Sequence, residues 1–141
     1  MDRTTFEDYI ARFNARDVTA FEQYLTDDME MLNGALRYTG IEGMKNHYVT
    51  KIWPHFIEKL NLIRFIGNDQ HVAVELRTEF TATDDCDDTL FGPVLKGEMF
   101  IYRGLIMYTL RDEKFATITV SYNSFTNVKT DGSTVEMGLP H

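Results

Sequence analysis

The sequence predicts an α+β domain in which helices cover one side of a strongly curved antiparallel sheet. Helical spacing of apolar residues is confined to the N-terminal part, alternating strand patterns fill the rest, and short turns join those strands. Helices followed by an antiparallel sheet are typical of the α+β class. Because long twisted strands curl, we expect a cone that side chains cannot fill near its mouth, and therefore a pocket there.

The N-terminal segment carries two short helical patterns. Phe6, Ile10 and Phe13 recur at intervals of four and three residues, which is the spacing of one buried helical stripe. A break at 14–17 separates this stripe from a second short helix over 18–25. We expect both helices to bury one face.

A hairpin and a third helix come next. Two short strands are expected at 29–33 and 36–39, because Asn33-Gly34 is a dipeptide typical of tight turns. Beyond Gly40 the apolar residues recur at helical intervals, and Pro54 ends that helix.

The second half predicts four long strands joined by turns. They are expected at 59–66, 72–80, 97–110 and 115–127, with an acidic loop at 83–95. The domain is therefore expected to span 1–128, followed by a flexible polar tail at 129–141.

Length and charge exclude several classes of protein. The 141 residues fit one domain, and a formal net charge of −8 opposes binding to nucleic acid. There is no apolar leader and no run near the roughly 20 residues that span a bilayer, so we expect a cytoplasmic protein without a membrane partner. The single cysteine, Cys86, lies among four aspartates, which disfavour a reactive thiolate.

Five segments together resemble the nuclear transport factor 2-like (NTF2-like) superfamily, and within it the SnoaL-like branch of polyketide cyclases, ketosteroid isomerases and scytalone dehydratase-type enzymes. The resemblance extends over about 4–127 and includes small fungal biosynthetic cyclases and isomerases. It implies a cone-shaped, cystatin-like fold, with three N-terminal helices packed on a curved antiparallel sheet that encloses a pocket. The segments are Tyr9–Asp17, Leu25–Asp28, Tyr38–Met44, Gly67–Val74 and Tyr108–Phe115.

The resemblance implies a cofactor-independent isomerase or cyclase of secondary metabolism, acting on a small hydrophobic natural-product intermediate. It also implies a homodimer through the outer face of the sheet, where Glu75, Arg77 and Glu79 alternate with apolar residues. Because enzymes and binding modules share this fold, a non-catalytic small-molecule-binding or dimerisation module stays open as the alternative.

Dehydration and epoxide hydrolysis are less favoured, because the residues those relatives use are replaced. The Tyr-Asp pair of scytalone dehydratase reads Phe13-Asn14 here, and its two strand histidines read Arg64 and Phe80. The acidic set of limonene epoxide hydrolase falls on apolar or hydroxyl residues, namely Leu76, Thr78 and Val120.

Five residues are candidates for acid-base chemistry. Arg37 and Arg64 could each hold an oxyanion. The alternative for Arg37 is an exposed hairpin residue. The alternative for Arg64 is a one-residue shift in strand register that turns its side chain outward. Glu98 shares strand parity with apolar residues, where burial would raise its pKa, unless it lies exposed at the rim. His47 could titrate near the mouth or lie on the helix surface, and Tyr108 could donate to an oxyanion or only pack.

The remaining pocket residues are predicted from strand parity and from the positions that relatives use. No metal is expected, because the four histidines lack Cys, Asp or Glu at ligand spacing. No cofactor is expected either. The predicted substrate-binding residues are Asn14, Tyr38, Trp53, Thr78, Phe80, Phe100, Tyr102, Val120 and Tyr122.

Overall fold

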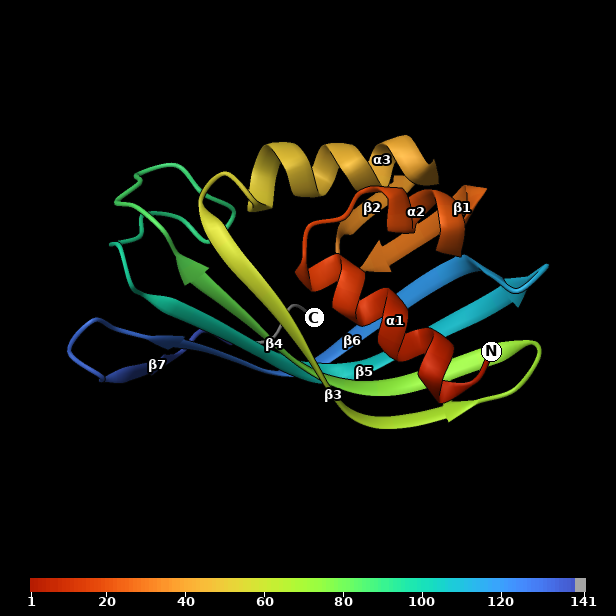
Figure 1. The fold of residues 1–141 in the computed structure, drawn as a ribbon. Helices are drawn as coiled ribbons and strands as arrows, with labels where there is room; N and C mark the ends of the chain where they lie inside the picture. Colours follow the sequence, from red (N-terminus) through yellow and green to blue (C-terminus); the bar gives the residue numbers. More distant parts are fainter. Residues whose placement is uncertain (139–141) are drawn as a thin grey trace.

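A curved seven-stranded sheet carries its helices on the concave side in the computed structural model, which describes residues 1–138 (Figure 1). A π-helical turn, η1, follows the last helix. The elements in chain order are α1 Arg3–Asn14, α2 Thr19–Tyr24, β1 Leu25–Asn33, β2 Leu36–Thr39, α3 Gly40–His47, η1 Tyr48–Ile52, β3 Phe56–Gly67, β4 His71–Ala82, β5 Met99–Arg111, β6 Lys114–Val128 and β7 Thr134–Glu136.

The strand order is β2-β1-β6-β5-β4-β3, with β7 added to β6. Strands β3 to β6 form an antiparallel meander, as predicted, but β1 runs parallel to β6. The prediction of a wholly antiparallel sheet is therefore wrong at this pairing. No tight turn links β1 to β6, so their direction is not forced by a hairpin.

The predicted helical stripe of α1 is buried, and Asp2 caps the helix by accepting a hydrogen bond from the Thr5 amide at 2.8 Å. Helix α2 is shorter than expected, because Leu25 already pairs with Phe115 in the sheet. The third predicted helix ends as the wider turn η1, where the Trp53 amide donates to the Tyr48 carbonyl at 2.8 Å. This turn buries Ile52.

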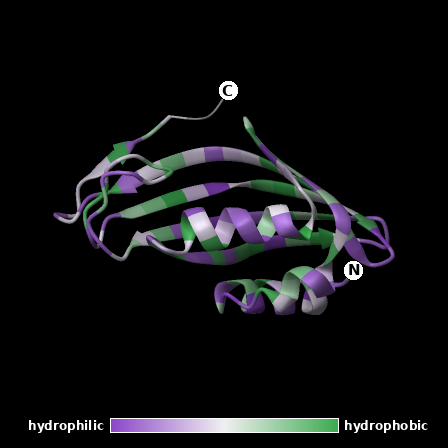
Figure 2. Ribbon diagram, turned by 90° about the horizontal axis from the view of Figure 1, so that it is seen from above, coloured by the Kyte–Doolittle hydropathy of each residue, from purple (hydrophilic) through white to green (hydrophobic). Residues whose placement is uncertain are grey.

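The sheet bends where β5 and β6 come unusually close. Their register shifts between Arg103 and Gly104, and a Cβ at Gly104 would lie 2.3 Å from the Ser121 carbonyl oxygen. Only glycine permits this approach, so the bend is built into the sequence. Figure 2 shows hydrophobic and hydrophilic residues alternating along these strands, so one face of the sheet is apolar.

The segment after β6 is more ordered than predicted. Residues 134–136 form β7 and pair with Thr126–Val128, so the expected loose tail is wrong for these residues. Residues 139–141 of that predicted tail lie outside the described part of the chain. Within residues 1–138, no helix is both long and apolar enough to traverse a bilayer.

Candidate active site

Two adjoining chambers lie between the concave face of the sheet and the helices. An inner chamber of about 60 Å³ is lined by residues of strands β1 to β6 and of α1, α3 and η1. A vestibule of about 440 Å³ adjoins it on the outer side. Side chains of the inner chamber include Tyr9, Tyr38, Thr78, Tyr108 and Val120, and those of the vestibule include Phe80, Phe91, Tyr102, Phe125 and Met137. Six residues line both: Asn33, Leu36, His47, Tyr48, Glu58 and Tyr122.

Glu58 lies at this junction and, of the described residues, is the only acidic one that lines either chamber. It sits on β3 opposite Phe80 and is 6% exposed, and its Oε2 atom has no hydrogen-bond partner among the described residues. Burial raises the pKa of the Glu58 carboxyl to about 8, although nearby Arg16 opposes the shift. The group therefore exchanges its proton near neutral pH.

Arg16 is held beside β3 rather than inside the cavity. It adopts a positive φ of 57° after α1, and its Nη2 donates to the Phe56 carbonyl at 2.7 Å. Its guanidinium also lies over the Trp53 ring, 5.9 Å from the ring centroid. The positive charge of Arg16 thus lowers the pKa of Glu58 by electrostatic attraction at a distance, and the two side chains do not form an ion pair.

His47, at the end of α3, is buried between two tyrosine rings. Its imidazole stacks on Tyr38 at 5.1 Å between centroids and meets the edge of Tyr48 at 4.9 Å. Burial, with a smaller effect of Lys51, lowers the pKa of His47 to about 4. The imidazole is therefore neutral at physiological pH, and its Nδ1 atom has no partner among the described residues.

The tyrosines around Glu58 remain protonated hydrogen-bond donors. Burial raises the pKa of Tyr48, Tyr108 and Tyr122 above the ordinary value, and that of Tyr102 to about 12. The Tyr122 hydroxyl lies 3.4 Å from Asn33 Nδ2, from which it accepts a hydrogen bond. Neutral donors of this kind can stabilise a developing oxyanion without bringing charge into the cavity.

Most of the predicted pocket residues line one or both chambers. They come from five elements: His47 from α3, Tyr38 from β2, and the others from the long strands β4, β5 and β6. Their roles in binding or catalysis stay predictions. Those that line the chambers are Tyr38, His47, Thr78, Phe80, Tyr102, Tyr108, Val120 and Tyr122.

Both predicted arginines point away from the cavity. Arg37 is exposed on β2, where the alternate residues Leu36 and Tyr38 face inward. Arg64 follows a β-bulge between Leu62 and Arg64, which reverses the side-chain alternation. Its side chain is 80% exposed, and the prediction that these two residues hold a substrate oxygen inside the pocket is wrong.

Glu98 is buried as predicted but lies outside both chambers. It precedes β5, and its Oε1 accepts a hydrogen bond from Lys129 Nζ at 3.3 Å. Lys129 belongs to the segment that was expected to be a loose tail. An ion pair therefore occupies Glu98, and the prediction of a carboxylate in the pocket wall is wrong for this residue.

Three predicted binding residues hold the walls together from behind. Asn14 exchanges two hydrogen bonds with the Leu60 backbone, at 2.8 and 3.0 Å, and so fixes the end of α1 to β3. Trp53 stacks on Phe21, and Phe100 belongs to a buried aromatic cluster. Asn14, Trp53 and Phe100 do not line either chamber, so the two chambers give no support to the prediction that they contact substrate.

Glu58 is the functional candidate that sequence reasoning missed. The predicted strand began at 59, whereas β3 begins at Phe56. Extending the alternation of Leu60 and Leu62 back by one step places Glu58 on the inner face. The alternating pattern that identifies Glu58 was therefore present in the sequence. The start of the strand was missed because Pro54 and the adjacent turn lie just before it. Among residues 1–138, no three His, Cys, Asp or Glu side chains form a metal-binding group.

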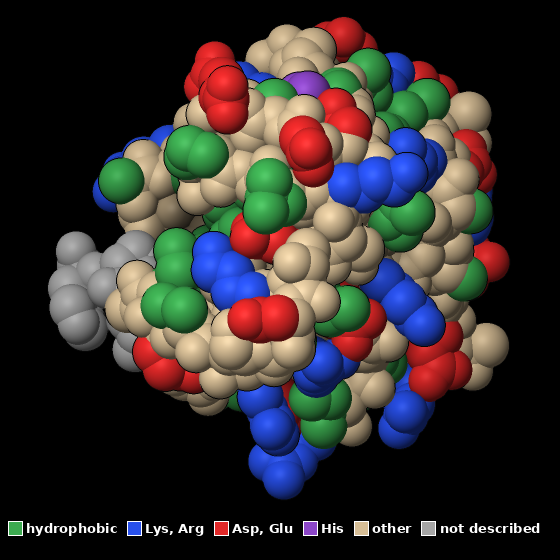
Figure 3. Space-filling view, turned by 90° about the vertical axis from the view of Figure 1, so that its left-hand side faces the viewer, with side chains coloured by type: hydrophobic (Ala, Val, Ile, Leu, Met, Phe, Trp, Pro, Cys, Tyr) green, Lys and Arg blue, Asp and Glu red, His purple; other side chains and the backbone are tan. Residues whose placement is uncertain are grey.

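Figure 3 shows the end of the molecule that carries loop 83–98 and β7. Hydrophobic side chains lie exposed there among acidic and basic ones. Leu90 and Met137, both vestibule residues, are 51% and 42% exposed. The vestibule thus has a partly apolar rim, which suits the entry of a hydrophobic molecule.

Comparison with known proteins identifies relatives of this architecture. The sequence model of the SnoaL-like domain matches residues 6–118. Solved structures of two candidate polyketide cyclases are similar. The one from Xanthomonas campestris is 21% identical, with a TM-score of 0.68 over 84% of this chain and 87% of that chain. The one from Pseudomonas putida is 23% identical, with a TM-score of 0.66 over 82% and 86%.

IdmH, a candidate polyketide cyclase from Streptomyces antibioticus, is 15% identical, with a TM-score of 0.66 over 85% of this chain and 90% of that chain. At these identities the likeness establishes the fold alone. No curated protein matches the chain significantly.

Proposed function

Because the chain belongs to the SnoaL-like domain family, we propose that it is a cofactor-independent isomerase or cyclase of secondary metabolism. Its substrate would be an uncharged, hydrophobic natural-product intermediate, and the reaction would be a proton transfer with rearrangement or ring closure. The observation that carries the proposal is Glu58, a buried carboxyl whose pKa is raised to about 8 at the junction of the two chambers.

The proposed reaction begins with Glu58 as a general base. At neutral pH roughly a tenth of Glu58 is ionised, given a pKa near 8. The carboxylate takes a proton from a carbon beside a carbonyl, and the electron pair moves to the carbonyl oxygen. The resulting enolate either recovers the proton at another carbon, which is isomerisation, or attacks a second carbonyl, which is ring closure.

Hydrogen-bond donors around Glu58 would stabilise that enolate oxygen. The hydroxyls of Tyr48 and Tyr122 line the same junction, and neutral His47 lies beside them. Each donor acts where water is largely excluded, so its effect on the developing charge is larger than in solution. The chain's own side chains thus supply both the base and the oxyanion donors.

The lining of the cavity supports an uncharged substrate. Among the described residues, neither chamber is lined by a lysine or an arginine, so no cation is available to pair with a carboxylate or phosphate. The vestibule walls are aromatic and large enough for a ring system, whereas the inner chamber has space only for a small group. The reactive end would therefore point inward.

The proposal can be tested without knowing the natural substrate. Wild-type protein is incubated in D₂O with aromatic ketones such as 2-tetralone, and the loss of α-proton signals is followed by NMR. We expect Glu58→Gln to lower the enzymatic exchange rate by about 10²- to 10⁴-fold, the usual contribution of a general base. Glu98→Gln is the matched control, because that buried carboxyl lies outside both chambers and should leave the rate within about threefold of wild type.

The alternative is a non-catalytic module that binds a small hydrophobic molecule. The small volume of the inner chamber favours it, because most of a ligand would stay in the vestibule. Under this alternative wild type and Glu58→Gln retain the same ketones equally and neither accelerates exchange. Equal exchange by wild type and Glu58→Gln would contradict Glu58 as the base.

We also propose a homodimer through the outer face of the sheet. Exposed Ile66, Leu105 and Met107 surround a hollow of about 480 Å³ that also contains Arg64 and Glu75. A second copy would cover these apolar side chains. Light scattering should give twice the chain mass for wild type and one chain mass for Leu105→Glu; a monomeric wild type would contradict the proposal.

A further inference from the structure

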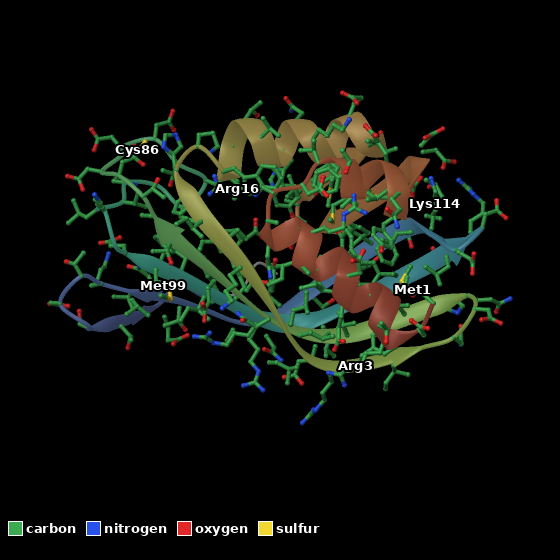
Figure 4. The ribbon with its side chains drawn as sticks, in the orientation of Figure 1. Met1, Arg3, Arg16, Cys86, Met99 and Lys114 are labelled. Atoms are coloured by element: carbon green, nitrogen blue, oxygen red, sulfur yellow. The ribbon has the colours of Figure 1, made fainter. Side chains whose placement is uncertain are left out.

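A second group of reactive side chains lies outside the cavity, where loop 83–98 meets the turn before β3. Cys86 Sγ is 4.0 Å from His55 Nε2, and His55 Nδ1 is 3.6 Å from Asp84 Oδ1. Figure 4 labels Cys86 on this loop, at the end of the molecule away from Met1. A thiol, an imidazole and a carboxylate in this order are the arrangement of an activated nucleophile.

Backbone contacts fix the three residues relative to one another. The Thr83 amide donates to the His55 carbonyl at 2.9 Å, and Thr83 Oγ1 lies within 3.2 Å of both that carbonyl and Asp84 Oδ1. The Cys86 amide and carbonyl both pair with Val94, at 3.0 and 2.8 Å. Hydrogen bonds of the backbone therefore hold the segments that carry these three side chains in place.

The thiol is reachable, whereas the far side of the imidazole is shielded. Cys86 is partly exposed and carries a free thiol. His55 Nδ1 is cut off from solvent and has no hydrogen-bond partner among the described residues, so the carboxylate of Asp84 is placed to stabilise the ring once it is protonated. The thiol also lies 3.5 Å from the Asp88 carbonyl, so it would have to turn from that acceptor to give its proton to His55 Nε2.

We propose that Cys86 is a nucleophile, with His55 as its base, that adds to soft carbon electrophiles of the α,β-unsaturated carbonyl class. The sulfur forms a bond with the β-carbon, and the electron pair of the carbon-carbon double bond moves to the α-carbon. The proton that His55 took from the thiol is delivered to the α-carbon. Atoms and charges balance, and no oxidant or leaving group is needed.

Charged residues of both signs surround the cysteine on this loop. Asp85, Asp87 and Asp88 are its acidic neighbours in sequence, and Lys96 follows them. The same loop supplies Leu90 and Phe91 to the vestibule, so an adduct on Cys86 would sit on the segment that forms its rim. The site is thus separate from Glu58 but adjacent to the entrance.

The test measures the rate of alkylation by N-ethylmaleimide at pH 7 by intact mass. Because the chain has one cysteine, every adduct reports on Cys86. The same protein unfolded in urea provides the rate of this thiol without its neighbours. We expect the folded chain to react at least about tenfold faster than the unfolded chain, and His55→Gln to remove that advantage.

His71→Gln is the matched control, since His71 is an exposed histidine at the start of β4, and its rate should equal that of wild type. Asp84→Asn should lower the rate more at pH 6 than at pH 9, because alkaline solution alone converts thiols into thiolates. An equal loss at both pH values would leave Asp84 with a structural role only. A folded chain that reacts no faster than the unfolded one, or a His55→Gln rate equal to wild type, would overturn the proposal.

Discussion

Glu58 and Glu75 lie on opposite faces of one sheet, are equally buried at 6% exposure, and have opposite surroundings. Glu75 faces outward, where its Oε1 accepts a hydrogen bond from Arg103 Nε at 2.9 Å and forms an ion pair with Arg103 Nη2 at 2.7 Å. Arg64 Nη1 lies 3.3 Å from Glu75 Oε2. Glu58 faces the cavity and has no such partner. Guanidinium groups compensate the negative charge of Glu75. Glu58 has a raised pKa and is mostly protonated, and therefore uncharged, at neutral pH.

This difference separates a structural carboxylate from a chemically useful one. A carboxylate whose oxygens are occupied by two arginines is part of a structural network and has no free oxygen for a substrate. A buried carboxyl without a cation partner has a pKa close to neutrality and can give or accept a proton at little cost. Burial alone therefore does not identify an active-site acid; the identity of its neighbours does.

The largest effect on stability is expected from pH. The pKa of Glu58 is raised from 4.5 to about 8 by folding, so the folded state binds more protons than the unfolded state in that window. Stability is then full below pH 4.5 and falls as pH rises to about 8. Between pH 6.5 and 8.5 the loss should be about 2 kcal/mol in the free energy of unfolding.

Urea unfolding at both pH values tests this expectation, because Glu58→Gln should remove the decline while Glu75→Gln keeps it. The pKa of His47 is lowered from 6.5 to about 4, so His47 destabilises the fold as pH falls through 6.5 and at pH 6.5 offsets only about 0.4 kcal/mol of the Glu58 effect. A decline of the same size in Glu58→Gln would show that the carboxyl is solvated in the folded protein.

A smaller effect is expected from removing the cation partner of Glu75. Arg103→Met leaves the buried carboxylate with Arg64 as its one cation partner, and we expect a loss of about 1–1.5 kcal/mol, reduced from the cost of a fully buried pair because Arg103 is 50% exposed. Urea unfolding at pH 7 with an unchanged m-value measures it.

The smallest effect on stability is expected from Arg64→Met. This side chain is 80% exposed, so its loss should cost no more than about 0.5 kcal/mol. If it cost as much as Arg103→Met, Arg64 would be a principal partner of Glu75, contrary to the geometry described above.

The spacing of apolar residues predicted the helices, the strands and the outward face of the sheet, because this spacing depends only on residues that are close in sequence. The stripe of α1 and the outward position of Glu75 followed from spacing alone. The bulge before Arg64 could not be predicted, because one extra residue reverses the alternation without changing the residue types. Long-range pairing was equally hidden: Lys129 meets Glu98 across 31 positions of sequence.

The site was predicted less well than the fold for the same physical reason. Tyrosines on the inner strand faces were found by parity, whereas the proton-exchanging group depends on which charges are absent from its surroundings. Glu58 differs from Glu98 in that it lines the cavity and has no ion-pair partner among the described residues, whereas Glu98 is paired with Lys129. That information exists only once the chain is folded.

The parallel pairing of β1 with β6 has a consequence for how the protein is made. Residues 25–33 emerge early from the ribosome, but their partner strand, 114–128, is among the last segments synthesised. The hairpin that carries Tyr38 must therefore wait for almost the whole chain before it can dock. A nascent chain that stalls in the acidic loop exposes an unpaired strand edge and has no cavity, so co-translational protection matters most for this first hairpin.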